Sequence, residues 1–117
     1  THQPIGTRPE SPQQRPLLDI IKKHVSKSNR PKTHVVLCGH EHRDWHREVD
    51  GVHHICINSA SYHWKEKPWP YEDSLFTFME INEGKLTLSG MKTKWTQRPE
   101  GVETDPAISE RELRFSD

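Results

Sequence analysis

The stretch Val35-Val36-Leu37-Cys38-Gly39-His40-Glu41-His42 decides how this chain is interpreted. Its apolar first half predicts a short buried strand. Gly39 has no Cβ, so the backbone there can turn sharply or approach a ligand closely. In extended backbone, side chains two residues apart point the same way, so we expect His40 and His42 to face one point while Glu41 turns aside. Two imidazoles aimed at one point from a strand end predict a metal site.

The residues around this pair resemble the calcineurin-like metallophosphoesterase family, whose last signature is a strand, then Gly-His-x-His, then a short hairpin. Residues 52–62 (VHHICINSASY) carry Asn-Ser-Ala-Ser after the predicted hairpin, as that family often has Asn-Ser there. The opening Thr1-His2-Gln3-Pro4 is similar to the preceding signature, in which a metal-binding histidine at a strand end is followed by a proline. The resemblance extends over about residues 1–90.

The resemblance implies a site that holds two divalent or trivalent metal ions, such as Mn, Fe or Zn, and hydrolyses phosphomonoesters or phosphodiesters. His2 and His40 correspond to ligands of one ion, and His42 to a ligand of the other. Neutral imidazoles leave the ions Lewis acidic, and two ions about 3.5–4 Å apart can neutralise phosphate oxygens. For His2, fraying of a chain end is the competing interpretation.

The end of the third predicted strand offers residues for a phosphate pocket. Asn58, Ser59 and Ser61 follow that strand at the same end of the sheet as the histidine loop, so we expect them to bind substrate. Turn-forming hydrogen bonds are an equally good reading of these residues. The aromatic loop at residues 62–71 (YHWKEKPWPY) is also open to two readings: it either stacks a base, sugar or lipid head group, or covers the sheet edge.

Several family motifs are missing. Asp-x-His, Gly-Asp and Gly-Asn-His-Asp/Glu come earlier in family members, and none of them precedes residue 33 here. The chain also starts inside a motif, so we expect it to be the C-terminal part of a longer phosphoesterase. Three neutral ligands without a carboxylate leave about four positive charges uncompensated. We therefore expect this chain alone to be inactive. Its expected partner is either the N-terminal part of the same enzyme or a second copy of the chain, bound across an exposed sheet face.

The expected fold is of the α/β class, namely the C-terminal half of a four-layer α/β/β/α sandwich, with mostly one β-sheet and one flanking helix. Periodicity predicts a helix from Pro16 to about Asn29, and Asp50-Gly51 predicts a hairpin turn. Strands are predicted at residues 33–38, 44–49, 52–58, 74–81 and 85–91, with residues 59–73 as a loop. We assign residues 1–95 to the phosphoesterase domain and residues 96–117 to a polar tail without a core of its own.

Composition limits the classes of function. Lysine plus arginine and aspartate plus glutamate both number 17, so the net charge of zero argues against a nucleic-acid-binding patch. No apolar run approaches the roughly 20 residues of a membrane span. Only 30% of the residues are apolar, which is low for a self-sufficient core and favours a partner chain. Cys38 and Cys56 are expected to be buried free thiols. The compartment is left open.

Two other functions compete with the phosphoesterase hypothesis. The first is a non-catalytic module of the same ancestry, stable as an oligomer and binding a partner or one metal ion. The second is a small histidine-rich metal-binding protein unrelated to phosphoesterases. A structural zinc site built from Cys38, His40, His42 and His46 is disfavoured, because such sites take ligands from two separated knuckles.

Overall fold

The computed structural model of the chain describes residues 2–5 and 11–115. Within them lie one helix and ten short strands, which form four small sheets. The elements are α1 (Arg15–Lys23), β1 (Val35–Cys38), β2 (Trp45–Val49), β3 (Val52–Cys56), β4 (Tyr62–Lys65), β5 (Lys67–Pro70), β6 (Met79–Asn82), β7 (Lys85–Leu88), β8 (Met91–Lys92), β9 (Ala107–Ile108) and β10 (Arg111–Arg114).

The first sheet carries the histidine motif and has the strand order β1-β3-β2. β1 runs parallel to β3, and β2 pairs antiparallel with β3. Asp50 and Gly51 form the β2–β3 turn with φ values of 50° and 75°. Two positive φ values in succession are typical of the turn that matches strand twist, which confirms the predicted hairpin.

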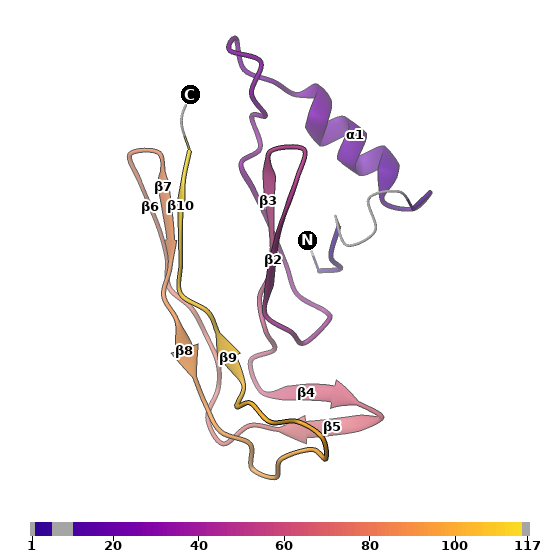
Figure 1. Cartoon of the computed structure of the whole chain (residues 1–117), viewed down its shortest axis with the longest axis vertical. Helices are drawn as coiled ribbons and strands as arrows, with labels where there is room; N and C mark the ends of the chain where they lie inside the picture. The colour runs from indigo at the N-terminus through magenta and orange to yellow at the C-terminus, as the bar shows by residue number, and fades with distance from the viewer. Residues whose placement is uncertain (1, 6–10, 116–117) are drawn as a thin grey trace.

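The second sheet packs against the first (Figure 1). It has the order β10-β7-β6, and both of its strand pairs are antiparallel. Ile55 of β3 joins Leu86, Leu88 and Leu113 of the second sheet in one buried cluster. Because side chains alternate along a strand, Val52 and His54 point to the opposite face of β3. The main core therefore lies between the two sheets.

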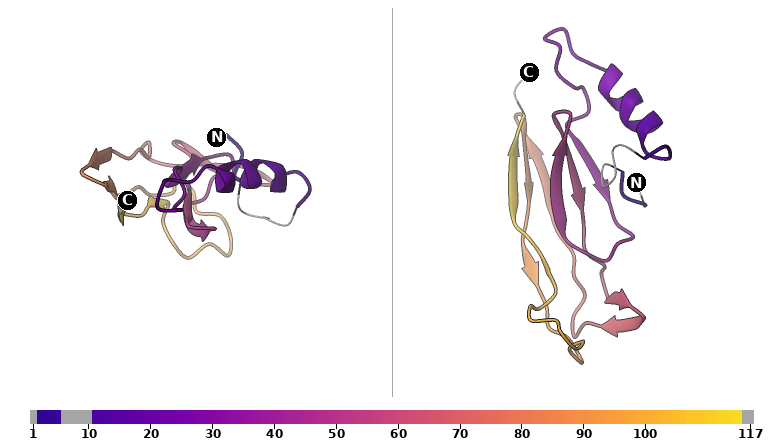
Figure 2. Two further views of the ribbon diagram at one scale, coloured as in Figure 1. Left: turned by 90° about the horizontal axis from the view of Figure 1, so that it is seen from above. Right: turned by 45° about the vertical axis from the view of Figure 1, so that its right-hand side comes forward.

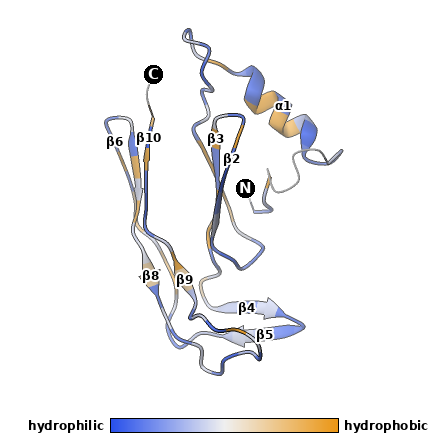
Figure 3. Cartoon of the chain, in the orientation of Figure 1, coloured by the Kyte–Doolittle hydropathy of each residue, from blue (hydrophilic) through white to orange (hydrophobic). Residues whose placement is uncertain are grey.

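Helix α1 lies on that opposite face, where Leu18 and Ile21 line a small space together with Val52 and His54. Pro16 stands in its first turn, as predicted, and Figure 3 shows an apolar stripe along it. The helix ends at Lys23 rather than near Asn29. The physical reason is local: the chain bends at His24, and the next residue, Val25, forms a bridge with Pro31. Figure 2 shows the helix beside the sheets from two further directions.

A second small core lies below the two sheets. Tyr71, Leu75 and Ile108 are buried together there, with the Trp95 ring packed against them. The β4–β5 hairpin projects from this region, and β8 pairs with β9 beside it (Figure 1). Residues 59–73, predicted to be a loop, thus contain a hairpin. Its two-stranded form tolerates Pro68 and Pro70, because prolines at an edge need not donate hydrogen bonds.

The expected architecture is wrong. Helix makes up 8% of the chain and strand 37%, and the strands are divided among small sheets instead of forming mostly one sheet in half of an α/β sandwich. The strands have two to five residues each, because positive-φ positions such as Glu66 and Glu83 interrupt them. Residues 96–117 also differ from the expected tail, since β9 and β10 place Ile108 and Leu113 in the two cores. The domain boundary at residue 95 stays a prediction.

Candidate functional site

The histidine motif begins where β1 ends. The Gly39 N–H donates a hydrogen bond to the carbonyl oxygen of His2 at 3.1 Å, and the Glu41 N–H donates to the Gly39 carbonyl at 2.9 Å. An added Cβ at Gly39 would stand 4.0 Å from the His2 carbonyl oxygen, which is ordinary contact. The N-terminal segment is therefore held beside the end of β1 by a backbone hydrogen bond.

This backbone contact brings two predicted ligands together. Nδ1 of His40 lies 3.0 Å from Nε2 of His2, and the two rings meet edge to face with centroids 4.9 Å apart. Both side chains are exposed. One nitrogen donates its proton to the other in this contact. Two nitrogens bound to the same ion at 2.0–2.1 Å lie about 3.0–3.4 Å apart, so the pair is already close to the spacing of two ligands.

His42 points elsewhere. Its Nδ1 lies 3.0 Å from the carbonyl oxygen of Tyr62, which can only accept a hydrogen bond. Nδ1 therefore carries the proton, and Nε2 keeps its lone pair. This tautomer, fixed by a bond to a carbonyl, is typical of histidines that ligate metals through the other nitrogen. His63 on β4 donates in turn to the His42 carbonyl at 2.9 Å, so the loop is tied to the β4–β5 hairpin.

His40 and His42 do not lie on the extended backbone that we expected. Their φ values are 72° and 53°, in the left-handed region, so the backbone is not extended there. Side chains two residues apart then need not share a face. Left-handed backbone at a residue other than glycine costs about 1 kcal/mol or more and tends to persist at functional sites. Glu41 does turn aside as expected, because its carboxylate accepts the Trp45 Nε1–H at 2.7 Å.

The residues under the loop are thiols. Cys38 and Cys56 stand opposite each other in the parallel register of β1 and β3, and both are buried and free, as predicted. The Cys56 thiol donates to the Gly39 carbonyl at 3.3 Å. Burial raises the pKa of Cys38, and it raises the pKa of Cys56 to about 12. These groups are therefore neutral thiols at physiological pH, not thiolate ligands.

Of the predicted substrate-binding residues, Asn58 has an internal role. Its amide nitrogen donates to the Ala107 carbonyl at 3.2 Å, and its oxygen accepts the Tyr71 hydroxyl at 3.1 Å. The same oxygen accepts the backbone N–H of Ser59 at 2.8 Å. Ser61 is exposed and its carbonyl accepts the Tyr71 N–H at 2.9 Å. Asn58 thus connects β3 to the C-terminal segment, and substrate contact by these three residues stays a prediction.

A cavity of about 390 Å³ opens next to His42. His42, His63, Tyr71 and Trp95 contribute to its wall, and Asn58 lies in it as well. The remaining wall comes from Arg43, Asp44 and six residues of the C-terminal segment, namely Val102, Thr104, Asp105, Pro106, Ala107 and Ser109. Sequence reasoning missed this wall, because no motif marks those residues. The one available signal was the cluster of aromatic residues around Tyr71.

An ion pair fixes the cavity wall. Arg111 donates from Nη1 to Oδ1 of Asp44 at 2.9 Å and from Nη2 to Oδ2 at 2.7 Å, and each side chain is only 11% exposed. The Ser109 N–H donates to the same carboxylate at 3.0 Å. Burial alone would raise the pKa of Asp44, but the bonds from Arg111 and Ser109 outweigh it and lower that pKa.

A second histidine pair lies on the first sheet. Nε2 of His46 is 3.0 Å from Nδ1 of His53, and His53 stands opposite Glu48 in the β2–β3 register. Burial, His53 and Arg111 lower the pKa of His46. His54 is fully buried, and within the part of the chain that the structure describes neither of its ring nitrogens has a hydrogen-bond partner of good geometry. Burial lowers its pKa, although the nearby Ile5 backbone opposes the shift.

The donor set fits a metal ion only in part. His2 and His40 suit a borderline divalent ion such as zinc or manganese by donor type and spacing. Among residues 2–5 and 11–115, however, no three side chains of histidine, cysteine, aspartate or glutamate gather closely enough to hold an ion. The His2–His40 pair can therefore supply two ligands, and the remaining ligands would have to come from other residues.

Comparisons with protein-family models, with curated proteins and with solved structures gave no match to this chain. Within the described residues, the only helix, α1, is too short to cross a membrane.

Proposed function

We propose that this chain supplies histidine ligands to the metal centre of a dinuclear phosphoesterase, which hydrolyses phosphomonoesters or phosphodiesters. The observation that supports the proposal most is the 3.0 Å contact between His2 and His40, which lie 38 residues apart in sequence. The resemblance of the Gly39-His40-Glu41-His42 segment to calcineurin-like metallophosphoesterases provides the reaction class. In such a site the ions supply Lewis acidity to phosphate oxygens.

The protein residues have separate tasks in this proposal. His2 and His40 would hold one ion, and the ring that now donates in their contact would adopt its other tautomer so that its lone pair faces the ion. Affinity should fall as the solution becomes acidic, because protonation of either imidazole competes with the ion. His42 offers Nε2 to a second ion, because the Tyr62 carbonyl keeps the proton on Nδ1. The backbone bond from Gly39 to the His2 carbonyl holds the two segments at the right separation.

The proposal requires acidic ligands from outside the described site. Glu41 accepts the Trp45 indole N–H, and Asp44 is paired with Arg111, so both nearby carboxylates already have partners within the protein. Without a carboxylate, the charge of two ions is not compensated and both should not bind tightly. Residues of a longer chain or a partner would provide the carboxylates. This shortage also favours the second candidate function, a non-catalytic module that binds a single ion.

Metal binding by variants tests the ligand assignment. Titration with Co²⁺ or Zn²⁺ at pH 7.5 should show one site, and His40→Ala or His2→Ala should weaken it about tenfold or more. The matched control is His46→Ala, because His46 and His53 form a histidine pair with the same 3.0 Å nitrogen separation. Retained affinity in His40→Ala together with loss in His46→Ala would refute the assignment.

Hydrolysis assays test the reaction class. The chain alone should not hydrolyse p-nitrophenyl phosphate or bis-p-nitrophenyl phosphate with Mn²⁺. Adding the protein segment that carries the missing acidic motifs should produce activity that His40→Ala abolishes. Activity of the chain alone that depends on His40 would contradict the expected need for outside ligands, and activity of the completed protein that survives His40→Ala would contradict the proposed function.

A further inference from the structure

The cavity beside His42 has features that indicate a ligand. Its volume of about 390 Å³ falls at the lower end of the roughly 300–1,000 Å³ of small-molecule sites. The rings of His63, Tyr71 and Trp95 line it, next to the predicted metal ligand His42. Two expected site residues, His42 and Asn58, lie in its wall, but its aromatic residues and its C-terminal wall have no place in the phosphoesterase resemblance.

The aromatic walls form a rigid corner. The Trp95 ring meets Tyr71 at 75° with centroids 5.4 Å apart, and it meets His63 at 80° with centroids 6.2 Å apart. The Trp95 indole donates to the Thr104 carbonyl at 2.9 Å, which fixes the ring. The Tyr71 hydroxyl is fixed by Asn58. A flat ring placed in such a corner can stack on one wall and receive an edge contact from another.

The charge of the cavity favours an anion. Asp44 is paired with Arg111, and Asp105 is paired with Arg98 at 2.6 Å, so both lining carboxylates are neutralised. The remaining lining cation is Arg43, which is exposed, directly follows His42, and has no ion pair within residues 2–5 and 11–115. A guanidinium offers several donors in a fork that matches phosphate oxygens.

We propose that this cavity binds a phosphate ester of a flat aromatic ring, such as a nucleoside monophosphate, with the ring against Trp95 and the phosphate at Arg43. The proposal rests on the proposed function only for its choice of phosphate as the anion. It places the phosphate beside His42 and the leaving group against the C-terminal segment. A phosphate ester of a simple sugar or alcohol would reach Arg43 but leave the aromatic corner empty.

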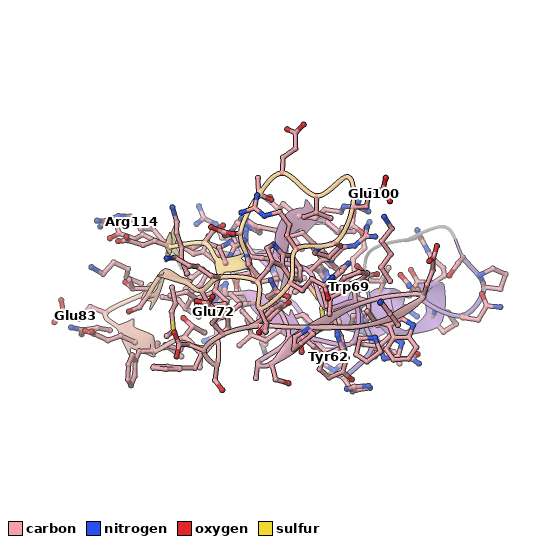
Figure 4. The ribbon with its side chains drawn as sticks, turned by 90° about the horizontal axis from the view of Figure 1, so that it is seen from below. Tyr62, Trp69, Glu72, Glu83, Glu100 and Arg114 are labelled. Atoms are coloured by element: carbon pink, nitrogen blue, oxygen red, sulfur yellow. The ribbon has the colours of Figure 1, made fainter. Side chains whose placement is uncertain are left out.

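The β4–β5 hairpin and the loop around Glu100 meet at the lower end of the molecule. Seen from below in Figure 4, the loop marked by Glu100 lies over the β4–β5 hairpin, which carries Tyr62 and Trp69. The Lys65 ammonium donates to the Glu100 carbonyl at 3.5 Å, so the loop and the hairpin are in contact outside the cavity. The hairpin and the segment after this loop both contribute to the cavity wall, through His63 and Val102.

Nuclear magnetic resonance of the four tryptophan indoles tests the proposal in EDTA, where the metal-binding hypothesis has no influence. AMP should shift the Trp95 indole signal and bind about tenfold more tightly than ribose 5-phosphate, because stacking of a base contributes about 1–3 kcal/mol. Arg43→Ala should weaken AMP about tenfold and leave adenosine unchanged. Trp64→Phe and Arg47→Ala are the controls, since neither residue lines the cavity.

A cavity-filling variant provides a second, independent test of the site. Val102→Trp should place a larger side chain in the cavity and abolish the AMP effect while preserving the other indole signals. Equal binding of AMP and ribose 5-phosphate, or shifts at Trp64 instead of Trp95, would overturn the proposal. If the protein binds AMP but its His40→Ala variant still binds the metal ion, the cavity proposal is supported and the phosphoesterase function is rejected. The two proposals can therefore fail separately.

Discussion

Breaking the ion pair between Arg111 and Asp44 should destabilise the fold strongly. Removing one partner of a buried pair costs about 3–5 kcal/mol, because the other charge stays buried without compensation. Each side chain here is 11% exposed, so we expect the lower end, about 3 kcal/mol, for Arg111→Ala. For a domain of this length, that loss corresponds to a fall in Tm of about 12 °C.

A double-mutant cycle separates the pair from its surroundings. Arg111→Ala, Asp44→Ala and the double variant are unfolded in urea and followed by tryptophan fluorescence, and the coupling free energy should be about 2 kcal/mol. The matched control is Arg98 with Asp105, an arginine–aspartate pair at 2.6 Å whose side chains are 46% and 41% exposed. Exposed pairs contribute only a few tenths of a kcal/mol.

The pKa of Asp44 provides a second measurement. In the intact protein the bonds from Arg111 and Ser109 hold this pKa below the normal value of 3.8 against the effect of burial. In Arg111→Ala the effect of burial remains, so the pKa should rise, and the carboxyl carbon chemical shift reports it. A coupling energy no larger than that of the control pair, with an unchanged Asp44 pKa, would refute the view that this pair holds the C-terminal segment in place.

Three further predictions follow from burial. The pKa of the buried His54 is lowered in the fold, so the unfolded chain binds more protons near pH 6. The unfolding free energy should therefore fall as pH drops below 6.5, by up to about 1.4 kcal/mol per pH unit. The exposed His46, whose pKa is also lowered, should add little because solvent screens it. A flat profile between pH 7 and pH 5 in chemical unfolding would contradict this. Leu88→Ala, at a fully buried site, should lower the free energy of unfolding in urea by about 2–5 kcal/mol. Ile81→Ala, at a site 67% exposed, should lower it much less. Similar losses in the two variants would show that the core is misplaced. Cys38 and Cys56 should resist iodoacetamide at pH 8 until the chain unfolds, because both thiols are buried and the Cys56 pKa is raised to about 12; rapid alkylation of the folded protein, measured by mass spectrometry, would disprove it.

Local sequence patterns predicted the centre of the fold well. The apolar run before Gly39 became β1, and β3 formed within the strand predicted at residues 52–58. The Asp50-Gly51 turn was also correct, because its backbone conformation is a property of those two residues. Each of these features depends on neighbours in sequence, which is why the pattern contained enough information.

The features that failed depend either on distant partners or on backbone conformations that no simple pattern marks. β10 has one buried residue, Leu113, in an otherwise polar segment, and it becomes a strand because it pairs with β7 more than twenty residues away. Pro68 and Pro70 suggested a loop, yet a two-stranded hairpin has free edges where proline is tolerated. The predicted ligands show the same limit. Only the resemblance connected His2 with His40, and no local rule indicated the left-handed backbone that turns His42 toward Tyr62.

Residues 96–117, which the sequence predicted to be a tail without a core of its own, should be essential for the stability of the fold. Deletion of these residues tests this prediction. The deletion removes Leu113 and Ile108, which are 8% and 2% exposed, and leaves Asp44 buried without Arg111. Burial of two such side chains and the broken ion pair together amount to about 7 kcal/mol, similar to the whole stability of a small domain. The truncated chain should therefore lose its cooperative thermal transition, although it keeps His2, His40 and His42. If the truncated chain melts within a few degrees of the full chain, residues 96–117 are the dispensable tail that their composition suggests. In that case the C-terminal segment does not form a stable wall of the cavity beside His42.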